Sequence, residues 1–336
     1  MFNGKKILIT GGTGSLGQAL TKKLLSQNVD TIRIFSRNEN KQVTMESEFQ
    51  DDRLRFFIGD VRDSSRLERA IEDVDIVFHA AALKHVPVIE YNPFEAVKTN
   101  VIGTQNLIEA CIHEDVETAV AVGTDKAVSP LNAYGATKLL MEKLFITARN
   151  YLKKENHRTR FVALRYGNVL GSSGSVVPKF INQISTEKKI SITNPAMTRF
   201  SITMNDALDF ILKTTTVAKG SEIFVPKLKA YTLEDMKNAL FDLLGKGEED
   251  TIPIRHGEKM HEILINKDEM RFTWETDSMY VIVKPELDEE TIPSLYTGFK
   301  KTSSLEQYSS DNVNTFSSDE LKKLLISKYP SLSKKS

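Results

Sequence analysis

Two groups of residues in the first half of the chain have types and spacings suited to acid–base chemistry. Tyr134 and Lys138 lie four residues apart, so a helix would place both side chains on one face. An ammonium group beside a phenol stabilises the phenolate, which would lower the pKa of Tyr134 from about 10 towards working pH. Thr124, Asp125 and Lys126 follow a short apolar run and place a carboxyl group next to an amine. Taken alone, both pairs are also consistent with exposed surface pairs.

A glycine cluster near the N-terminus could bind a pyrophosphate. The glycines stand three residues apart, between a β-branched run at 5–10 and a helical pattern at 18–26. Glycine at such a turn lets backbone N–H groups approach phosphates at a helix N-terminus. A plain turn would explain the cluster as well, but its position after a first strand favours a dinucleotide site. The expected cofactor contacts are Gly11, Thr13, Gly14, Ser15, Leu16 and Gly17.

The residues about 20 positions past the glycines bear on which dinucleotide is bound. NAD sites usually have an acidic residue there, and NADP sites an arginine. Here Ser36 and Arg37 follow the run 31–35, with Lys41 four residues further on and no acidic residue at that point. We therefore predict NADP, with Asp60 near the adenine. The alternative is that Arg37 is a solvated loop cation.

The elements that must position these residues alternate along the first half of the chain. Strand-like runs are expected at 5–10, 31–35, 54–58, 75–80, 118–122 and 160–164, and helices include 93–112 and 134–152. This alternation predicts an α/β fold, a Rossmann-type, doubly wound parallel sheet with helices on both faces. Ligands bind at the carboxyl ends of such strands, where Thr124 to Lys126 are expected.

The alternation ends near residue 167, which predicts a second, smaller unit. We expect residues 1–167, with part of 200–224 returning to them, to form the NADP-binding domain. Residues 168–199 and 225–336 are expected to form an interleaved C-terminal substrate-binding lobe and tail.

Composition excludes several classes of protein. The 336 residues carry 45 Lys+Arg and 45 Asp+Glu, and this balance argues against binding nucleic acid through general phosphate attraction. A single cysteine and scattered histidines predict no disulfide framework and no metal site. No apolar run approaches the ~20 residues that cross a bilayer. We expect a soluble, cytoplasmic protein.

Motifs along nearly the whole chain resemble the extended short-chain dehydrogenase/reductase family. The match is closer still to its inverting UDP-N-acetylglucosamine 4,6-dehydratases of pseudaminic acid and capsular polysaccharide biosynthesis. The motifs include TGGTGSLG (10–17), HAAALKHVP (79–87), TDKA (124–127), YGATK (134–138), RYGNVLGSSGSVVP (165–178), MTRF (197–200) and RHGEK (255–259). The family usually has Phe where this chain has Leu16.

The resemblance implies a reaction with NADP recycled in each turnover. C4 of UDP-N-acetylglucosamine is oxidised, water is lost across C5 and C6, and hydride returns to C6. The product is UDP-2-acetamido-2,6-dideoxy-L-arabino-hex-4-ulose, inverted at C5. Tyr134 would accept the C4 hydroxyl proton and Asp125 would be the acid. Lys126, where retaining relatives have Glu, would be the base, which requires a lowered pKa.

The resemblance also implies further contacts and a homo-oligomer, a hexamer or a dimer. Cofactor contacts are implied at Val61, Ala80, Ala81, Ala82 and Asn100, together with Tyr134 and Lys138, and substrate contacts at Lys84, Asn168, Val169, Arg199, Arg255 and Glu258. Arg is suited to a diphosphate because its planar fork bonds two oxygens at once. Two rival functions stay open, a nucleotide-sugar 4-epimerase of the same fold and a non-catalytic NADP-binding regulator.

Overall fold

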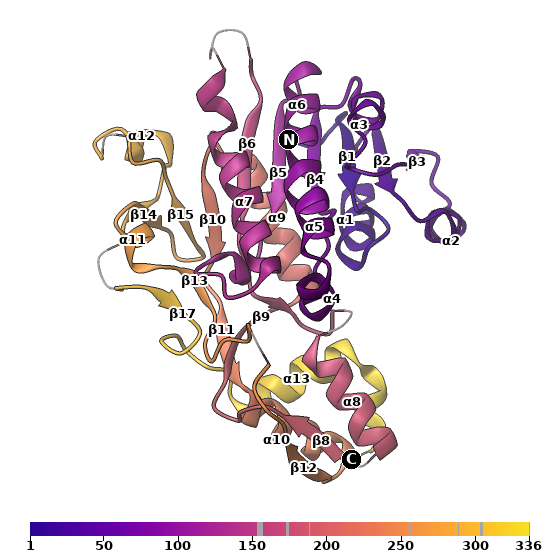
Figure 1. Ribbon diagram of the computed structural model, residues 1–336, viewed down its shortest axis with the longest axis vertical. Helices are drawn as coiled ribbons and strands as arrows, with labels where there is room; N and C mark the ends of the chain where they lie inside the picture. The colour runs from indigo at the N-terminus through magenta and orange to yellow at the C-terminus, as the bar shows by residue number, and fades with distance from the viewer. Residues whose placement is uncertain are drawn as a thin grey trace.

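A ten-stranded sheet forms the centre of the molecule (Figure 1). The computed structural model describes residues 1–152, 157–172, 175–187, 189–255, 257–287, 289–302 and 305–335. Seven strands of the sheet are parallel, in the spatial order β3 (Leu54–Ile58), β2 (Thr31–Ser36), β1 (Lys6–Thr10), β4 (Ile76–His79), β5 (Thr118–Val122), β6 (Arg160–Leu164) and β10 (Ile223–Pro226). The predicted Rossmann-type parallel sheet is confirmed.

Three antiparallel strands extend this sheet beyond β10. They are β15 (Met279–Ile282), β14 (Thr273–Glu275) and β16 (Lys300–Lys301). The sequence predicts that 225–336 belong to the smaller lobe, whereas these strands lie in the large sheet. The reason is that β15 is buried along its whole length and pairs with β10, while a short reversal suffices to bring β14 against it. Where one lobe ends and the other begins stays a prediction.

Helices cover both faces of the sheet. One face packs against α1 (Ser15–Leu25) and α9 (Met204–Val217), and the other against α3 (Ser64–Ile71), α6 (Gly103–His113) and α7 (Ala133–Thr147). The other helical elements of this half are α2 (Glu39–Phe49), α4 (Val86–Tyr91), α5 (Pro93–Ala96), η1 (Val97–Ile102), η2 (Asp125–Ala127) and η3 (Ala148–Tyr151). The helix expected at 93–112 is divided by η1, a π-helical turn, and π-turns often occur at functional sites.

A smaller lobe with its own apolar core lies at one end of the molecule (Figure 1). Its helices are α8 (Val176–Glu187), α10 (Leu233–Leu244), α13 (Ser318–Lys328) and η4 (Pro330–Lys335), and its strands β8 (Lys189–Ile192) and β12 (Glu248–Thr251) pair in parallel. Between the lobes lie β7 (Asn168–Val169), β9 (Thr198–Ile202), β11 (Lys229–Thr232), β13 (Ile263–Ile265) and β17 (Tyr308–Ser309) (Figure 1). Two short helices, α11 (Lys267–Met270) and α12 (Ile292–Leu295), lie beside the antiparallel strands of the large sheet. Among the described helices, none has the length and apolar character needed to cross a bilayer.

Candidate active site

The loop between β1 and α1 has the shape of a pyrophosphate cradle. Gly11 has φ +68°, and a Cβ there would lie 2.9 Å from the Ala81 Cα. A Cβ on Gly17 would lie 2.4 Å from the carbonyl oxygen of Gly12, so only glycine lets α1 approach β1 this closely. Gly14 is the N-cap of α1 and offers no side-chain cap, and the first turn of α1 carries no acidic residue. The N-terminal N–H groups of α1 therefore fit an anionic ligand.

The segment after β4, Ala80 to Lys84, packs against the loop between β1 and α1, and the side chain of Asn100 holds its backbone. The buried Asn100 side chain accepts from the Leu83 N–H (2.8 Å) and donates to the Leu83 carbonyl oxygen (3.0 Å) and to Thr137 Oγ1 (3.0 Å). The Ala81 N–H lies 3.3 Å from Thr10 Oγ1. The structure thus brings Ala80, Ala81 and Ala82 beside Gly11. Asn100 therefore fixes the backbone of this segment at Leu83.

The carboxyl ends of β2 and β3 lie side by side, which places Arg37 near Asp60. Arg37 Nη1 is 3.6 Å from Asp60 Oδ2, and Arg62 Nη2 is 2.7 Å from the same oxygen. Burial acts to raise the pKa of Asp60, but the hydrogen bonds from Arg62 outweigh it and hold that pKa below its ordinary value. Ser36 is buried and Lys41 is exposed, while Val61 is buried beneath α6.

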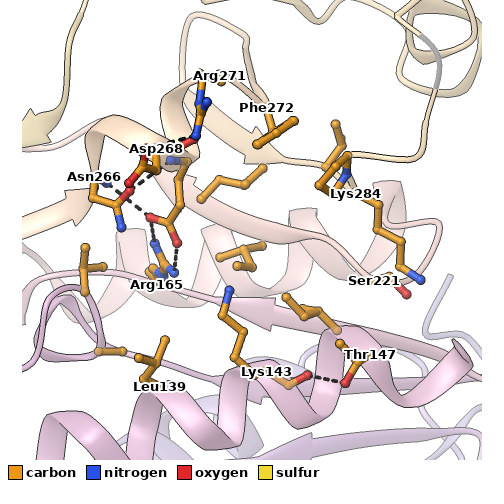
Figure 2. Close-up of a pocket in the computed structure, with 18 of the residues that line it drawn as sticks. Leu139, Lys143, Thr147, Arg165, Ser221, Asn266, Asp268, Arg271, Phe272 and Lys284 are labelled. Atoms are coloured by element: carbon orange, nitrogen blue, oxygen red, sulfur yellow. Dashed lines mark hydrogen bonds and ion pairs between the residues drawn. The ribbon is translucent and has the colours of Figure 1, made fainter.

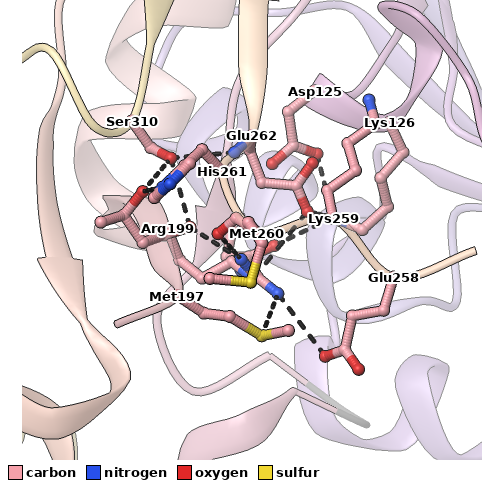
Figure 3. A network of polar contacts seen from close by, with 12 residues as sticks. Asp125, Lys126, Met197, Arg199, Glu258, Lys259, Met260, His261, Glu262 and Ser310 are labelled. Carbon is pink, nitrogen blue, oxygen red and sulfur yellow. Dashed lines mark hydrogen bonds and ion pairs between the residues drawn. The ribbon is translucent and has the colours of Figure 1, made fainter. Parts of the chain in front are cut away.

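Lys126 belongs to a polar network at the carboxyl end of β5, and its side chain is partly exposed (Figure 3). Its Nζ is 3.0 Å from Asp125 Oδ1, 3.4 Å from Asn168 Oδ1 and 3.5 Å from Glu262 Oε1. Asp125 is only 1% exposed and accepts a hydrogen bond of 2.8 Å from Thr124 Oγ1. The alternative of an exposed Asp125–Lys126 pair is therefore wrong.

Two pKa expectations are also wrong in this structure. Burial acts to lower the pKa of Lys126, but the carboxylates of Asp125 and Glu262 raise it above its ordinary value. Burial raises the pKa of Tyr134, and although Lys126 and a hydrogen bond to Thr124 oppose this, Lys138 has no part in it. Instead the Lys138 ammonium donates to the Val122 carbonyl oxygen at 2.6 Å, and burial lowers its own pKa to about 7.

The predicted substrate residues divide into a buried and a more open set. Arg199 is buried, donates to the carbonyl oxygens of Thr198 (2.8 Å) and Met260 (3.1 Å), and has Nη2 3.5 Å from Glu258 Oε1. A surface role for Arg199 is thus excluded. Arg255 and Glu258 line a cavity of about 130 Å³ against α8 and β8. Val169 pairs with β9, Lys84 is exposed, and His256 of the RHGEK motif lies outside the described residues.

Two charged residues lie at this site although they are not among the site residues predicted from the sequence. Glu262 contacts Lys126 and Arg199, and Lys259 Nζ donates to the Val128 carbonyl oxygen at 2.6 Å. Lys259 closes the RHGEK motif, and Glu262 follows it by three residues. The motif is the one sequence signal that points to this segment.

A larger cavity of about 470 Å³ begins at Ala127, the last residue of η2, and does not include Asp125 or Lys126 (Figure 2). Residues 127–129 form one wall, and the rest comes from α7, β10 and the segment 266–286. At its floor Arg165 donates to Glu142 and Glu269. None of the predicted site residues lines this cavity.

The parallel sheet and the glycine cradle define a Rossmann-type protein, and its fold is that of the short-chain dehydrogenase/reductase class. The family described as "Polysaccharide biosynthesis protein" matches residues 7–284, and the chain belongs to this family. The resemblance found in the sequence is thereby confirmed.

Individual relatives agree with this membership over almost the whole chain. An inverting UDP-N-acetylglucosamine 4,6-dehydratase of Campylobacter jejuni subsp. jejuni serotype O:23/36 (strain 81-176) is 46% identical over 327 residues, covering 95% of this chain and 96% of the relative. A UDP-glucose 4-epimerase of Rickettsia felis is 41% identical over 331 residues, covering 97% and 96%. The X-ray structure of Pen from Bacillus thuringiensis has a TM-score of 0.91 at 38% identity, covering 99% of both chains.

Proposed function

We propose that this protein is a UDP-N-acetylglucosamine 4,6-dehydratase that inverts C5 and uses NADP. The observation that carries the proposal is the Asp125–Lys126 pair, in which a buried carboxylate contacts a partly exposed amine, with Nζ and Oδ1 3.0 Å apart at the carboxyl end of β5 and Tyr134 at the start of α7. An elimination across C5 and C6 needs an acid and a base aimed at neighbouring atoms. A 4-epimerase needs neither. The similarity to the Campylobacter dehydratase supports the substrate.

The Asp125–Lys126 pair contains the two protonation forms that the elimination requires. Transfer of one proton from Lys126 Nζ to Asp125 Oδ1 gives a neutral amine and a carboxylic acid with no change in net charge. The amine then removes the C5 proton, and the acid protonates the departing C6 hydroxyl, which leaves as water. Lys126 ends as an ammonium and Asp125 as a carboxylate, so the pair returns to its starting form. When hydride is returned to C6, C5 takes a proton from solvent on its opposite face, which gives the inverted product.

The other residues prepare and hold the sugar. A nicotinamide cofactor, when bound, supplies the hydride acceptor for C4 and the hydride donor for C6. Tyr134 accepts the C4 hydroxyl proton once the phenol has released its own proton to solvent, and it returns to the phenol form in this step. Arg199, Arg255 and Glu258 hold the nucleotide diphosphate side of the substrate, and Asn168 orients Lys126.

NADP is preferred to NAD because Arg37 and Lys41 follow β2, where NAD sites usually have an acidic residue, and the nearby Asp60 comes from the end of β3 instead. Ser36, Arg37 and Lys41 would hold the 2′-phosphate. Arg37→Ala should weaken NADP binding by about tenfold to a hundredfold and leave NAD binding nearly unchanged, since one charge-assisted contact is lost. Calorimetric titration with both dinucleotides measures this, with Arg69→Ala, an exposed arginine of α3, as the control. Equal weakening for both dinucleotides would contradict the assignment.

We also propose a homo-oligomer, a hexamer or a dimer, that works in the cytoplasm. The exposed apolar residues Tyr91 of α4, Phe94 of α5 and Leu140 of α7 support the oligomer.

Product analysis in heavy water tests the reaction. The protein is incubated with UDP-N-acetylglucosamine without added cofactor, and the nucleotide sugar is followed by nuclear magnetic resonance. We expect a 4-keto, 6-deoxy product of L-arabino configuration with solvent deuterium at C5. A freshly formed D-configured product would contradict inversion. UDP-N-acetylgalactosamine would instead identify a 4-epimerase, and an unchanged substrate would identify a regulator.

A further inference from the structure

We infer that Glu262 is a positioning residue that holds Lys126 and stabilises the ammonium that Lys126 forms as it takes the C5 proton. This inference rests on the proposed function. Glu262 stands outside the TDKA and YGATK motifs and comes from a segment 136 positions further along the chain than Lys126.

The backbone of Glu262 is fixed at the start of β13. Its N–H donates to Ser310 Oγ at 2.9 Å, and its carbonyl oxygen accepts from the Ser310 N–H at 2.8 Å. Ser310 follows β17, which pairs with β13. The residue is 4% exposed, and its side chain points towards the network around Lys126 (Figure 3).

The Glu262 carboxylate bridges two cations of the site. Oε1 is 3.5 Å from Lys126 Nζ and 3.9 Å from Arg199 Nε. Oε2 is buried and has no hydrogen-bond partner among the described residues. A buried carboxylate is costly unless opposite charge compensates it, and Lys126 and Arg199 supply that charge.

Several groups face Lys126 from the surrounding elements. Asp125 lies on the same turn, Glu262 precedes β13, Tyr134 comes from α7, and Asn168 from β7 contributes an uncharged amide oxygen. Lys259 is the neighbouring cation on the Glu262 segment. Within 4 Å of Nζ, the negative groups among the described residues are therefore Asp125 and Glu262.

The order of proton transfers makes Glu262 the decisive one of these two. When Lys126 removes the C5 proton, Asp125 still carries the proton that it will give to the C6 hydroxyl. Asp125 is then neutral and cannot stabilise the new ammonium. Glu262 is the carboxylate that remains, as the third member of a catalytic triad stabilises a base that gains a proton.

The test compares Glu262→Gln with Glu262→Asp and Glu258→Gln. Trace acetylation with limiting acetic anhydride, followed by mass spectrometry of the Lys126 peptide, reports the fraction of neutral amine at fixed pH. Lys126 is partly exposed, so the reagent reaches it. Loss of a carboxylate within 4–6 Å shifts a pKa by about one unit or more, so acetylation of Lys126 in Glu262→Gln should rise about tenfold relative to the other lysines.

Kinetics supply the second measurement. Glu262→Gln should lower kcat at least tenfold with little change in KM, because Lys126 becomes a weaker base. Glu262→Asp keeps the charge and should recover part of both effects, and it also serves if the glutamine variant does not fold. Glu258→Gln, which loses a contact to Arg199, should raise KM and leave Lys126 acetylation unchanged.

Unchanged Lys126 acetylation in Glu262→Gln, or an equal rise in Glu258→Gln, would overturn the inference, as would an unchanged kcat. Because acetylation requires no turnover, a protein that forms no dehydratase product would refute the proposed function separately. The acetylation result would still decide whether Glu262 controls this amine.

Discussion

Burial and neighbouring charges shift the pKa values of the two lysines of this site in opposite directions. Lys126 has carboxylate neighbours and keeps its proton. The Lys138 ammonium instead donates to the Val122 carbonyl oxygen and the Met141 sulfur, and no carboxylate of the described residues forms a hydrogen bond with it. Glu142, the next carboxylate, is bound by Arg165. Two lysines twelve residues apart therefore have pKa values displaced in opposite directions.

The first residue-scale prediction concerns the phenol. Tyr134→Phe removes one oxygen and keeps the ring, so the fold should persist while turnover falls by about 10²- to 10⁴-fold, the usual contribution of a positioned acid–base group. The rate of 4-keto product formation measures this, with circular dichroism as the control for folding. Near-normal turnover would mean that another group accepts the C4 hydroxyl proton.

The second prediction concerns stability and pH. Lys138 has a pKa of about 7 when folded and about 10.4 when unfolded, so the unfolded chain binds more protons between these values. The buried charge therefore destabilises the fold fully below pH 7, and this penalty disappears as the pH rises towards 10. Lys138→Met should be more stable than the parent at pH 6, and its advantage should shrink by about 1.4 kcal/mol for each pH unit above 7.

Urea unfolding at several pH values measures this difference. Lys143→Met, an exposed lysine of the same helix, is the matched control and should show no such trend. A Lys138→Met advantage that does not change with pH would show that Lys138 keeps its proton in the folded protein over this pH range.

At the scale of elements, the close approach of α1 to β1 depends on one glycine. A Cβ on Gly17 would collide with the backbone of Gly12, whereas a Cβ on Gly14 would lie 3.2 Å from the Gly11 carbonyl oxygen. Gly17→Ala should therefore lower the free energy of unfolding by about 1–3 kcal/mol, a typical overpacking penalty, and weaken cofactor binding as α1 moves.

Denaturant unfolding and dinucleotide titration measure these effects. Gly14→Ala serves for comparison, because its contact is milder and its cost in stability should be smaller. Equal stability of Gly17→Ala and the parent would show that the loop adjusts without displacing α1.

How far the elements could be predicted depends on how local their signals are. The strand at 118–122 and the glycine turn after Thr10 are encoded within a few residues, and the structure has them where the sequence predicts them. The sequence predicts one helix at 93–112, but the structure divides it at the π-helical turn η1. That turn contains Asn100, whose contact with Leu83 joins residues 17 positions apart and leaves no local signal in the sequence. The contact between Glu262 and Lys126 could not be predicted, because the two residues are far apart along the chain and hydrophobic periodicity reports only on local structure.

At the scale of the whole molecule, buried charge joins the sheet to the segment that carries Glu262. Arg165 at the end of β6 uses all five of its N–H groups, which donate to Glu142 of α7, Glu269 of α11 and the Leu264 carbonyl oxygen of β13. The same β13 begins directly after Glu262. The antiparallel strands and the contacts of Arg165 join residues that are far apart along the chain. Local sequence patterns do not reveal such contacts, so the sequence alone predicts that 225–336 belong to the smaller lobe.

The last prediction concerns assembly. Tyr91 and Phe94 are 88% and 79% exposed on α4 and α5, and both short helices pack against α7, where Leu140 is also exposed. Apolar side chains gathered on one surface mark an interface more often than free surface. We expect the parent protein to sediment as a dimer or larger oligomer, and Tyr91→Asp with Phe94→Asp to sediment as a monomer, because two charges would be buried without partners. Val43→Asp, an exposed apolar position on α2, should leave the oligomer intact. A monomeric parent, or a double variant of unchanged mass, would place the subunit contact on another face.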